Sequence, residues 1–220
     1  VLGDGIDASA IELRDRAGLV ARIAVGTDEV VEGTAALSGE LVATVLGPEL
    51  LVSGSDAVGG ARRWAFGLGG AVVAGWAPIG QGCRWMHQIG AGRLAPDGRL
   101  EVIAVRTPHI GGVVQAYRVV DGRLQVVASA GGYSSHQLGS ANLDMALLAD
   151  ADGDGRLNVI VPTQGMDEVA LLARRDDGFD ELGRLALGGR LATNVAATQD
   201  VDGGIVLAAG TDDGRLRIFR

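Results

Sequence analysis

The chain has 220 residues, of which 47% are hydrophobic and 21% are charged, a composition typical of a folded globular protein that excludes a disordered chain. Its formal net charge of −8 disfavours nucleic acid as a partner, because a phosphate backbone binds to basic surfaces. Glycine is unusually frequent, with 36 residues against a typical share of ~7%, which indicates many tight turns between short strands.

Three further features of the sequence narrow the class of protein. It contains no run of about 18 apolar residues, so we expect no transmembrane helix and no direct membrane insertion. Cys83 is the only cysteine, which rules out a disulfide within the chain. The first residue is Val1 and not Met, so we expect a leader to have been removed from a precursor.

A short apolar strand that also contains arginine recurs five times, usually running into a turn that contains glycine. The copies occupy residues 10–18, 61–70, 113–122, 169–178 and 215–220, at intervals of about 50 residues. Pairs such as Asp121-Gly122 are strong hairpin signals, because both central residues of a type I′ turn need positive φ. The chain is therefore predicted to be a series of repeated β units.

The clearest internal pair is WMHQIG at residues 85–90 and SSHQLG at residues 134–139. Each is followed by D-G-R-L and an apolar run, which starts from Asp97 in the first copy and from Asp154 in the second. The later copy carries about eight extra residues, around residues 140–147. The first copy predicts strands over residues 86–91, 100–106, 113–119 and 124–129.

These units predict an all-β fold, since no stretch shows the apolar period of a helix. A four-stranded unit cannot bury both faces alone, and ring closure solves this problem in a β-propeller. We expect one domain over residues 1–220 with about five four-stranded blades, four being the alternative. Either the N- and C-terminal strands share the blade that closes the ring, or residues that precede Val1 in the precursor complete it. The repeats are placed at about 1–31 (partial), 32–80, 81–132, 133–189 and 190–220 (partial).

The stretch DADGDGRLN, residues 150–158, carries the most specific chemistry in the sequence. Its acidic residues alternate, which lets carboxylates on a tight turn converge on one hard cation such as Ca²⁺. The expected ligands are Asp150, Asp152, Asp154, the carbonyl of Arg156 and the side chain of Asn158. The competing interpretation is a solvated turn that tolerates acidic residues.

An EF-hand would open with the same spacing but would need a glutamate at position 12 and a following helix. Position 12 is Val161, and the run LNVIVP that contains it is typical of a strand. We therefore predict a calcium loop within a β-hairpin.

The stretch DADGDGRLN resembles the calcium loop of FG-GAP or VCBS repeats, the blades of integrin-α-like β-propellers, where D-x-D-G-D-G-x-x-D joins the first two strands of a blade. More loosely, residues 84–109 are similar to FG-GAP-like, VCBS repeat-containing proteins of alphaproteobacteria. The resemblance implies a periplasmic or secreted protein with Ca²⁺ in a structural role. Asn158 stands where the family has its final carboxylate, which predicts weaker binding of the ion.

The other repeats have lost the acidic residues of this loop. In the preceding repeat Arg93 and Ala95 stand where Asp150 and Asp152 would be, so that only Asp97 remains. One ion site is therefore expected in the whole chain.

Histidines are the main candidates for chemistry outside the loop. His87 and His136 hold equivalent repeat positions, which favours a structural role such as a hydrogen bond between blades; ligand or metal binding is the alternative. His109 lies in the loop TPHIGG and is expected to be exposed. Ser134 and Ser135 precede His136, but adjacency in sequence does not supply the geometry of a nucleophile and its base.

The remaining candidates have ordinary structural interpretations. A lone cysteine such as Cys83 is more often a buried apolar residue than a nucleophile. The tryptophans Trp64, Trp76 and Trp85 could stack on sugars, but in β proteins such residues more often pack between strands.

Two functions of different class follow. The first is a non-catalytic, calcium-stabilised propeller that binds a protein or glycan partner, such as a component of a cell-envelope or membrane complex. Its candidate recognition loops are residues 75–85, 106–112 and 140–147. The second is a hydrolase or lyase that acts on a polysaccharide in the central channel, with acid and base groups around His87, His136 and Asp144.

Overall fold

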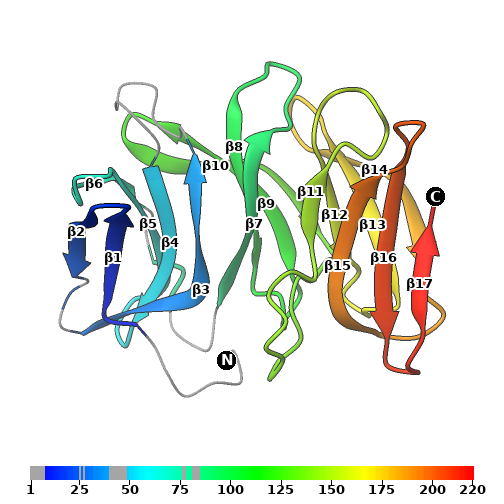
Figure 1. Cartoon of the computed structure of the whole chain (residues 1–220), viewed down its shortest axis with the longest axis horizontal. Helices are drawn as coiled ribbons and strands as arrows, with labels where there is room; N and C mark the ends of the chain where they lie inside the picture. The colour runs from blue at the N-terminus through cyan, green and yellow to red at the C-terminus, as the bar shows by residue number, and fades with distance from the viewer. Residues whose placement is uncertain (1–7, 25, 27, 40–48, 76–77, 81–84) are drawn as a thin grey trace.

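The computed structural model of the chain describes residues 8–24, 26, 28–39, 49–75, 78–80 and 85–220. Every regular element in these residues is a β-strand, as the sequence predicts (Figure 1). The earlier strands are β1 (Ala10–Asp15), β2 (Gly18–Ala24), β3 (Glu29–Gly39), β4 (Glu49–Asp56), β5 (Gly60–Phe66), β6 (Val72–Gly75), β7 (Met86–Arg93), β8 (Leu100–Arg106) and β9 (Val113–Val120). The later strands are β10 (Arg123–Gly131), β11 (Leu147–Ala149), β12 (Asn158–Pro162), β13 (Glu168–Arg174), β14 (Phe179–Ala186), β15 (Leu191–Gln199), β16 (Ile205–Thr211) and β17 (Leu216–Phe219).

Consecutive strands pair antiparallel in three sets of four, which we call the first (β3–β6), second (β7–β10) and third (β11–β14) meanders. Tight turns make this pairing possible. Between β9 and β10, Asp121 and Gly122 have φ of 51° and 70°, the positive values that a type I′ turn requires. The four strands predicted between residues 86 and 129 are confirmed as β7–β10.

Two further sheets flank the meanders. The hairpin β1–β2 lies at the N-terminal side and the three-stranded sheet β15–β17 at the C-terminal side. The first and second meanders are also joined into one eight-stranded sheet by a single parallel contact between Gly75 of β6 and Arg123 of β10.

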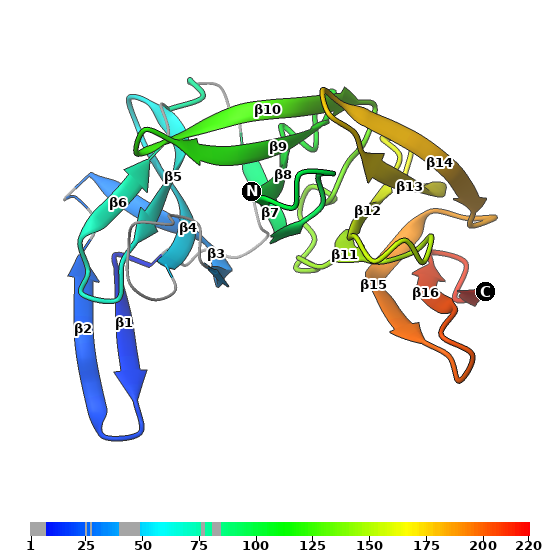
Figure 2. The ribbon, with the colours of Figure 1, turned by 90° about the horizontal axis from the view of Figure 1, so that it is seen from above.

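The sheets follow one another along a curved path, with the β1–β2 hairpin at one end and β15–β17 at the other (Figure 2). This differs from the expected closed ring of five blades. Among the described residues, β1 pairs with β2 alone in its sheet, and β15–β17 has three strands where the meanders have four. The two ends of the path therefore share no sheet, and the described chain forms an open arc.

The core lies between successive meanders, so their central strands are buried on both faces. In β8, Val102 packs toward the first meander with Leu51, and the next residue, Ile103, packs toward the third meander with Val159. The same holds for β12, all of whose residues are buried. This explains why these strands read as continuous apolar runs instead of alternating patterns.

Among the residues that the structure describes, no helix is long and apolar enough to cross a membrane.

Candidate functional site

The loop DADGDGRLN joins β11 to β12, the first two strands of the third meander. The carboxylates of Asp150, Asp152 and Asp154 lie within 4.8 Å of one another, and no other group of this kind is found in the described part of the chain. Gly153 and Gly155 have φ of 74° and 84°, values that only glycine adopts without cost, and they turn the loop back on itself. The three aspartates could hold a metal ion.

Hydrogen bonds within the loop fix its shape. Asp150 accepts the backbone N–H groups of Gly153 at 2.8 Å and Gly155 at 2.9 Å. The Oδ1 atom of the buried Asn158 accepts the N–H of Ala151 at 2.7 Å and that of Asp152 at 3.3 Å. Asn158 thus orders the loop from β12, while its role as a ligand, like that of the Arg156 carbonyl, stays a prediction.

The donor set fits a hard cation, because three carboxylates converge on one point. Asp154 also pairs with the Arg156 guanidinium, and this hydrogen bond lowers the pKa of the Asp154 carboxyl. All three carboxylates belong to residues that are partly or fully exposed, so an ion has access from solvent. Nothing in this geometry distinguishes Ca²⁺ from other hard cations.

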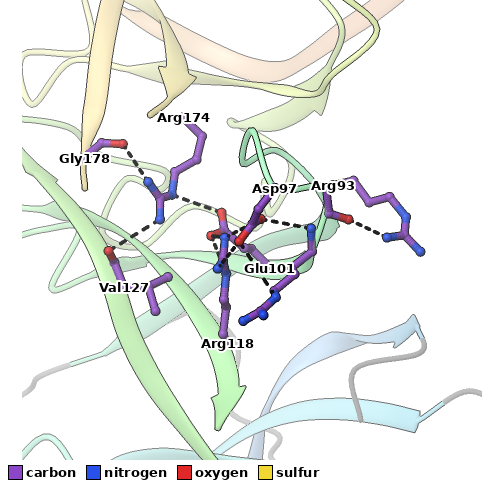
Figure 3. Close-up of polar contacts among 9 residues, drawn as sticks. Arg93, Asp97, Glu101, Arg118, Val127, Arg174 and Gly178 are labelled. Atoms are coloured by element: carbon purple, nitrogen blue, oxygen red, sulfur yellow. Dashed lines mark hydrogen bonds and ion pairs between the residues drawn. The ribbon is translucent and has the colours of Figure 1, made fainter. Parts of the chain in front are cut away.

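The equivalent loop of the second meander holds a guanidinium between its remaining acidic groups (Figure 3). Arg118 donates to the two carboxylate oxygens of Asp97 at 2.7 and 2.9 Å and to Glu101 at 2.9 Å. In the repeat, Asp97 corresponds to Asp154 and Glu101 to Asn158. The loop that has lost two aspartates is therefore neutralised by a side chain of its own meander.

The three histidines of the chain gather around one tryptophan at the opposite end of the meanders. The Trp85 ring stacks on His87 with centroids 4.8 Å apart and on His109 at 5.7 Å, while His136 meets its edge at 4.9 Å. Trp85 and His136 are buried, and His109 is half-buried. The expectation that His109 is exposed is therefore wrong.

Two hydrogen bonds fix the loop that carries His109 against the cluster. The N–H of Thr107 donates to the carbonyl of Trp85 at 2.8 Å, and the hydroxyl of Ser134 donates to the carbonyl of Pro108 at 2.8 Å. Loop and cluster thus belong to one hydrogen-bonded unit that spans two meanders.

A hydrogen bond between neighbouring repeats, expected from the equivalent histidines, is confirmed. The Nδ1 atom of His87 in β7 lies 2.9 Å from the hydroxyl oxygen of Ser135, which belongs to the next repeat and is fully buried. The bond ties the second meander to the segment that leads into the third.

The tautomers of His136 and His109 follow from their partners. The Nε2 atom of His136 lies 2.8 Å from the carbonyl oxygen of Ser140, which can only accept, so Nε2 carries the proton. In the neutral ring Nδ1 is then an acceptor, and it lies 2.8 Å from Nε2 of His109, which must donate. Nδ1 of His109 then carries a lone pair that has no hydrogen-bond partner among the described residues.

Both rings are held in the neutral form. Burial, with a smaller contribution from the neighbouring His136, lowers the pKa of His109 from 6.5 to about 4. Burial also lowers the pKa of His136, against the opposing effect of the hydrogen bond to Ser140. At neutral pH the pair therefore offers an uncharged base and no positive charge.

A cavity of about 430 Å³ opens beside this pair. Its walls come from the loop after β8, the segment before β11, the β12–β13 loop and the residue before β15. The polar side chains among them are His109, Ser134, His136, Gln137, Gln164 and Arg190. Leu138 and Met166 add apolar surface, and none of the described residues that line the cavity is acidic.

Two residues with a strained backbone lie at or next to this cavity: Met166 lines it, and Thr107 precedes the lining residue Pro108. Thr107 has φ of 49° and Met166 has φ of 63°, and they are two of the three non-glycine residues with positive φ in the described part of the chain. Positive φ is unfavourable for a β-branched residue such as threonine. A strained backbone conformation persists only where the surrounding structure holds it in place, and such conformations are found preferentially at functional sites.

The remaining candidates lie elsewhere. Asp144 is exposed and does not line the cavity, so no carboxylate joins His87 and His136 there. Trp64 packs near Phe66, with ring centroids 6.4 Å apart, in a different cluster from Trp85. Cys83 and Trp76 lie outside the described residues.

Comparison with known proteins finds similar structures but no similar sequences. No family model matches the sequence, and no curated protein matches it. The structure is similar to rhamnogalacturonan lyase YesW, with a TM-score of 0.57 and 14% identity over 94% of this chain and 45% of that one. It is also similar to rhamnogalacturonan lyase PL11 of Bacillus licheniformis, with a TM-score of 0.55 and 14% identity over 91% of this chain and 40% of that one.

A third similar structure is the exotype rhamnogalacturonan lyase YesX, with a TM-score of 0.51 and 14% identity over 96% of this chain and 49% of that one. The chain thus spans less than half the length of each of these lyases. At this identity the similarity is one of fold alone.

Proposed function

We propose that the chain is a non-catalytic module that binds a glycan at the cavity beside His109 and His136. The observation that carries this proposal is the cavity itself. Its volume of about 430 Å³ suits a small ligand or one or two sugar units, since ligand pockets measure about 300–1,000 Å³. A protein partner would instead need a surface of about 800 Å².

The walls of the cavity suit a sugar. Glutamine, histidine and arginine side chains offer hydrogen bonds to hydroxyl groups, and Leu138 and Met166 offer apolar contact to the ring carbons. The similar solved structures are named as lyases of a polysaccharide, which supports a glycan over a protein as the partner.

We also propose that the meanders are blades of an FG-GAP or VCBS-type β-propeller and that the Asp loop binds one structural Ca²⁺. Two observations support this. The loop lies between the first two strands of a meander, as the resemblance requires. In the sister loop, the Arg118 guanidinium neutralises the acidic groups that remain. In the Asp loop, Asp154 is the only one of the three aspartates with an ion pair among the described residues, and its partner is Arg156.

The ion and the ligand would occupy opposite ends of β12. The Asp loop enters β12, and the β12–β13 loop, which contributes Gln164 and Met166 to the cavity, leaves it. The ion would therefore hold the hairpin and take no part in ligand contact. The family resemblance further suggests a periplasmic or secreted module, with its glycan carried by a cell-envelope component.

A second candidate function is a polysaccharide lyase, and the free Nδ1 of His109 favours it. In a lyase acting on a uronate, this atom would take the proton next to the carboxylate, the electron pair would form a carbon–carbon double bond, and the glycosidic bond would break. The oxygen that leaves would take a proton from water. His109 is neutral and can therefore accept a proton, while its pKa of about 4 makes it a weak base. No acidic group lines the cavity among the described residues.

The test is calorimetric titration of the chain with a panel of soluble polysaccharides. Leu138 lines the cavity and its side chain is 73% exposed, so Leu138→Trp blocks the cavity without burying a new group. The control is Val201→Trp, because Val201 is fully exposed in the β15–β16 turn, away from the cavity.

We expect at least one polysaccharide to bind, Leu138→Trp to weaken that binding about tenfold or more, and Val201→Trp to leave it unchanged. Equal binding by both variants would contradict the cavity as the site. Appearance of the ultraviolet absorbance of an unsaturated uronate, lost in His109→Ala, would identify the lyase instead.

A further inference from the structure

Among the described residues, Arg190 is the only cationic residue that lines the cavity, and its side chain has no partner there. No ion pair or side-chain hydrogen bond involves its guanidinium among the described residues, whereas the arginines at 118, 174, 184 and 217 all pair with acidic groups. Arg190 is exposed, as is Arg123, which also has no ion pair among the described residues; Arg190 differs from Arg123 in that it lines the cavity.

The backbone of Arg190 is fixed while its side chain is free. Its N–H donates to Oδ1 of Asp212 at 3.0 Å, and its carbonyl accepts the N–H of Asp212 at 2.9 Å. This pair of hydrogen bonds anchors the start of β15 to the end of β16. These bonds fix where the side chain of Arg190 begins, while ordering the guanidinium on a ligand still costs side-chain entropy.

The other free polar atoms at the cavity are acceptors. Gln137 donates its amide N–H to the carbonyl of Leu191, which leaves its side-chain oxygen without a partner among the described residues. Nδ1 of His109 is a lone pair, as derived above from its bond to His136. Arg190 and the residues that carry these two acceptors all line the same cavity.

We propose that the cavity binds an acidic sugar, with its anionic group on Arg190 and its hydroxyl groups on Gln137 and His109. This rests on the proposed glycan-binding function and narrows it to a class of ligand. A guanidinium matches a carboxylate with two parallel hydrogen bonds, and hydroxyl groups donate to the oxygen of Gln137 and to the histidine nitrogen. Sulfate esters share the anionic chemistry with carboxylates.

The experiment compares four probes by calorimetric titration: polygalacturonate, the same polymer with its carboxyl groups reduced to alcohols, a neutral galactan and dextran sulfate. The variants are Arg190→Gln and Arg190→Lys, with Arg123→Gln as the matched control. Arg123 is exposed and has no ion pair among the described residues, and it begins β10 at the end of the meander away from the cavity.

We expect polygalacturonate to bind and its reduced form to bind at least tenfold more weakly. Arg190→Gln should weaken binding about ten- to one-hundred-fold, Arg190→Lys less so, and Arg123→Gln not at all. Tighter binding of dextran sulfate than of polygalacturonate, with the same loss in Arg190→Gln, would support the anion site with a sulfate ester as its group.

Two results would overturn the proposal of an acidic ligand, and only the second would also count against the proposed glycan-binding function. Equal binding of the reduced polymer or the galactan, unaffected by Arg190→Gln, would overturn the acidic ligand and leave the glycan-binding function standing. Binding of none of the four probes, with the folded state intact by circular dichroism, would count against both.

Discussion

Arg174 and Glu101 form an ion pair buried between two consecutive meanders: Nε of Arg174 lies 3.1 Å from Oε2 of Glu101, and the side chains are 1% and 0% exposed. Arg174 also donates to the carbonyl of Gly178 at 3.2 Å, and Arg118 reaches Glu101 from the opposite side (Figure 3). One carboxylate thus joins the second meander to the third.

Removing one partner of this pair should strongly destabilise the chain. Arg174→Ala leaves the buried carboxylate of Glu101 with one guanidinium instead of two, and we expect a loss of about 3–5 kcal/mol in the free energy of unfolding. Asp180→Ala, which breaks the exposed pair of Arg175 and Asp180, should cost below about 1 kcal/mol. Urea denaturation measures both, and equal costs would contradict the importance of burial.

Calcium should stabilise the chain through the Asp loop alone. At about one hundred times its dissociation constant, an ion bound only to the folded state adds about 2.7 kcal/mol, which raises the Tm by about 5–10 °C in a chain of this size. We expect Asp152→Ala to abolish the increase. Asp97→Ala, in the sister loop, lowers the Tm by itself but should keep the full calcium increment.

Calorimetric melting with calcium and with a chelator measures this difference. A calcium increment that survives in Asp152→Ala, or one that is lost in Asp97→Ala, would contradict the assignment of the ion to residues 150–158.

The histidine pair should make the chain less stable in mild acid. In the unfolded chain both histidines take up a proton near pH 6.5, whereas in the folded chain the pKa of His109 is about 4 and that of His136 is also lowered. Between these values the unfolded state binds more protons, so the free energy of unfolding falls as the pH falls from 6.5 toward 4.

Urea denaturation at several pH values measures this slope. His109→Gln removes one of the two groups and should flatten the profile between pH 6.5 and 4, while the decline below pH 4, to which carboxylates contribute, remains. An unchanged slope in the variant would show that His109 titrates normally in the folded chain.

Much of the strand pattern was accessible from the sequence. Asp-Gly turns and apolar runs are local signals, and they placed the strands between residues 86 and 129 within a few residues of β7–β10. The arrangement of the two ends of the arc could not be predicted from the sequence. Whether β1–β2 and β15–β17 join one ring depends on contacts between distant segments, which no local pattern encodes.

The residues of the candidate site could be predicted from the sequence only in part, for a similar reason. His87 and His136 stand out because the repeat places them equivalently, but His109 has no counterpart in the repeat and lies in a loop. Its place in the cluster depends on the bonds of Thr107 and Pro108 to residues of other segments. Nothing in the sequence marks Arg190 as a site residue, because only the folded structure shows that it lines the cavity and has no ion pair among the described residues.

The most direct test of the central claim is a nuclear magnetic resonance spectrum of the chain with isotope-labelled histidines, recorded with and without polygalacturonate oligomers. Three histidines give three assignable rings, and the free chain should show His109 neutral, protonated at Nε2 and unprotonated at Nδ1. We predict that the oligomer shifts the Nδ1 signal of His109 strongly, because His109 lines the cavity and its Nδ1 is the ring nitrogen not bonded to His136. Binding of the oligomer that leaves all three rings unshifted would place the ligand elsewhere and contradict the cavity as the binding site.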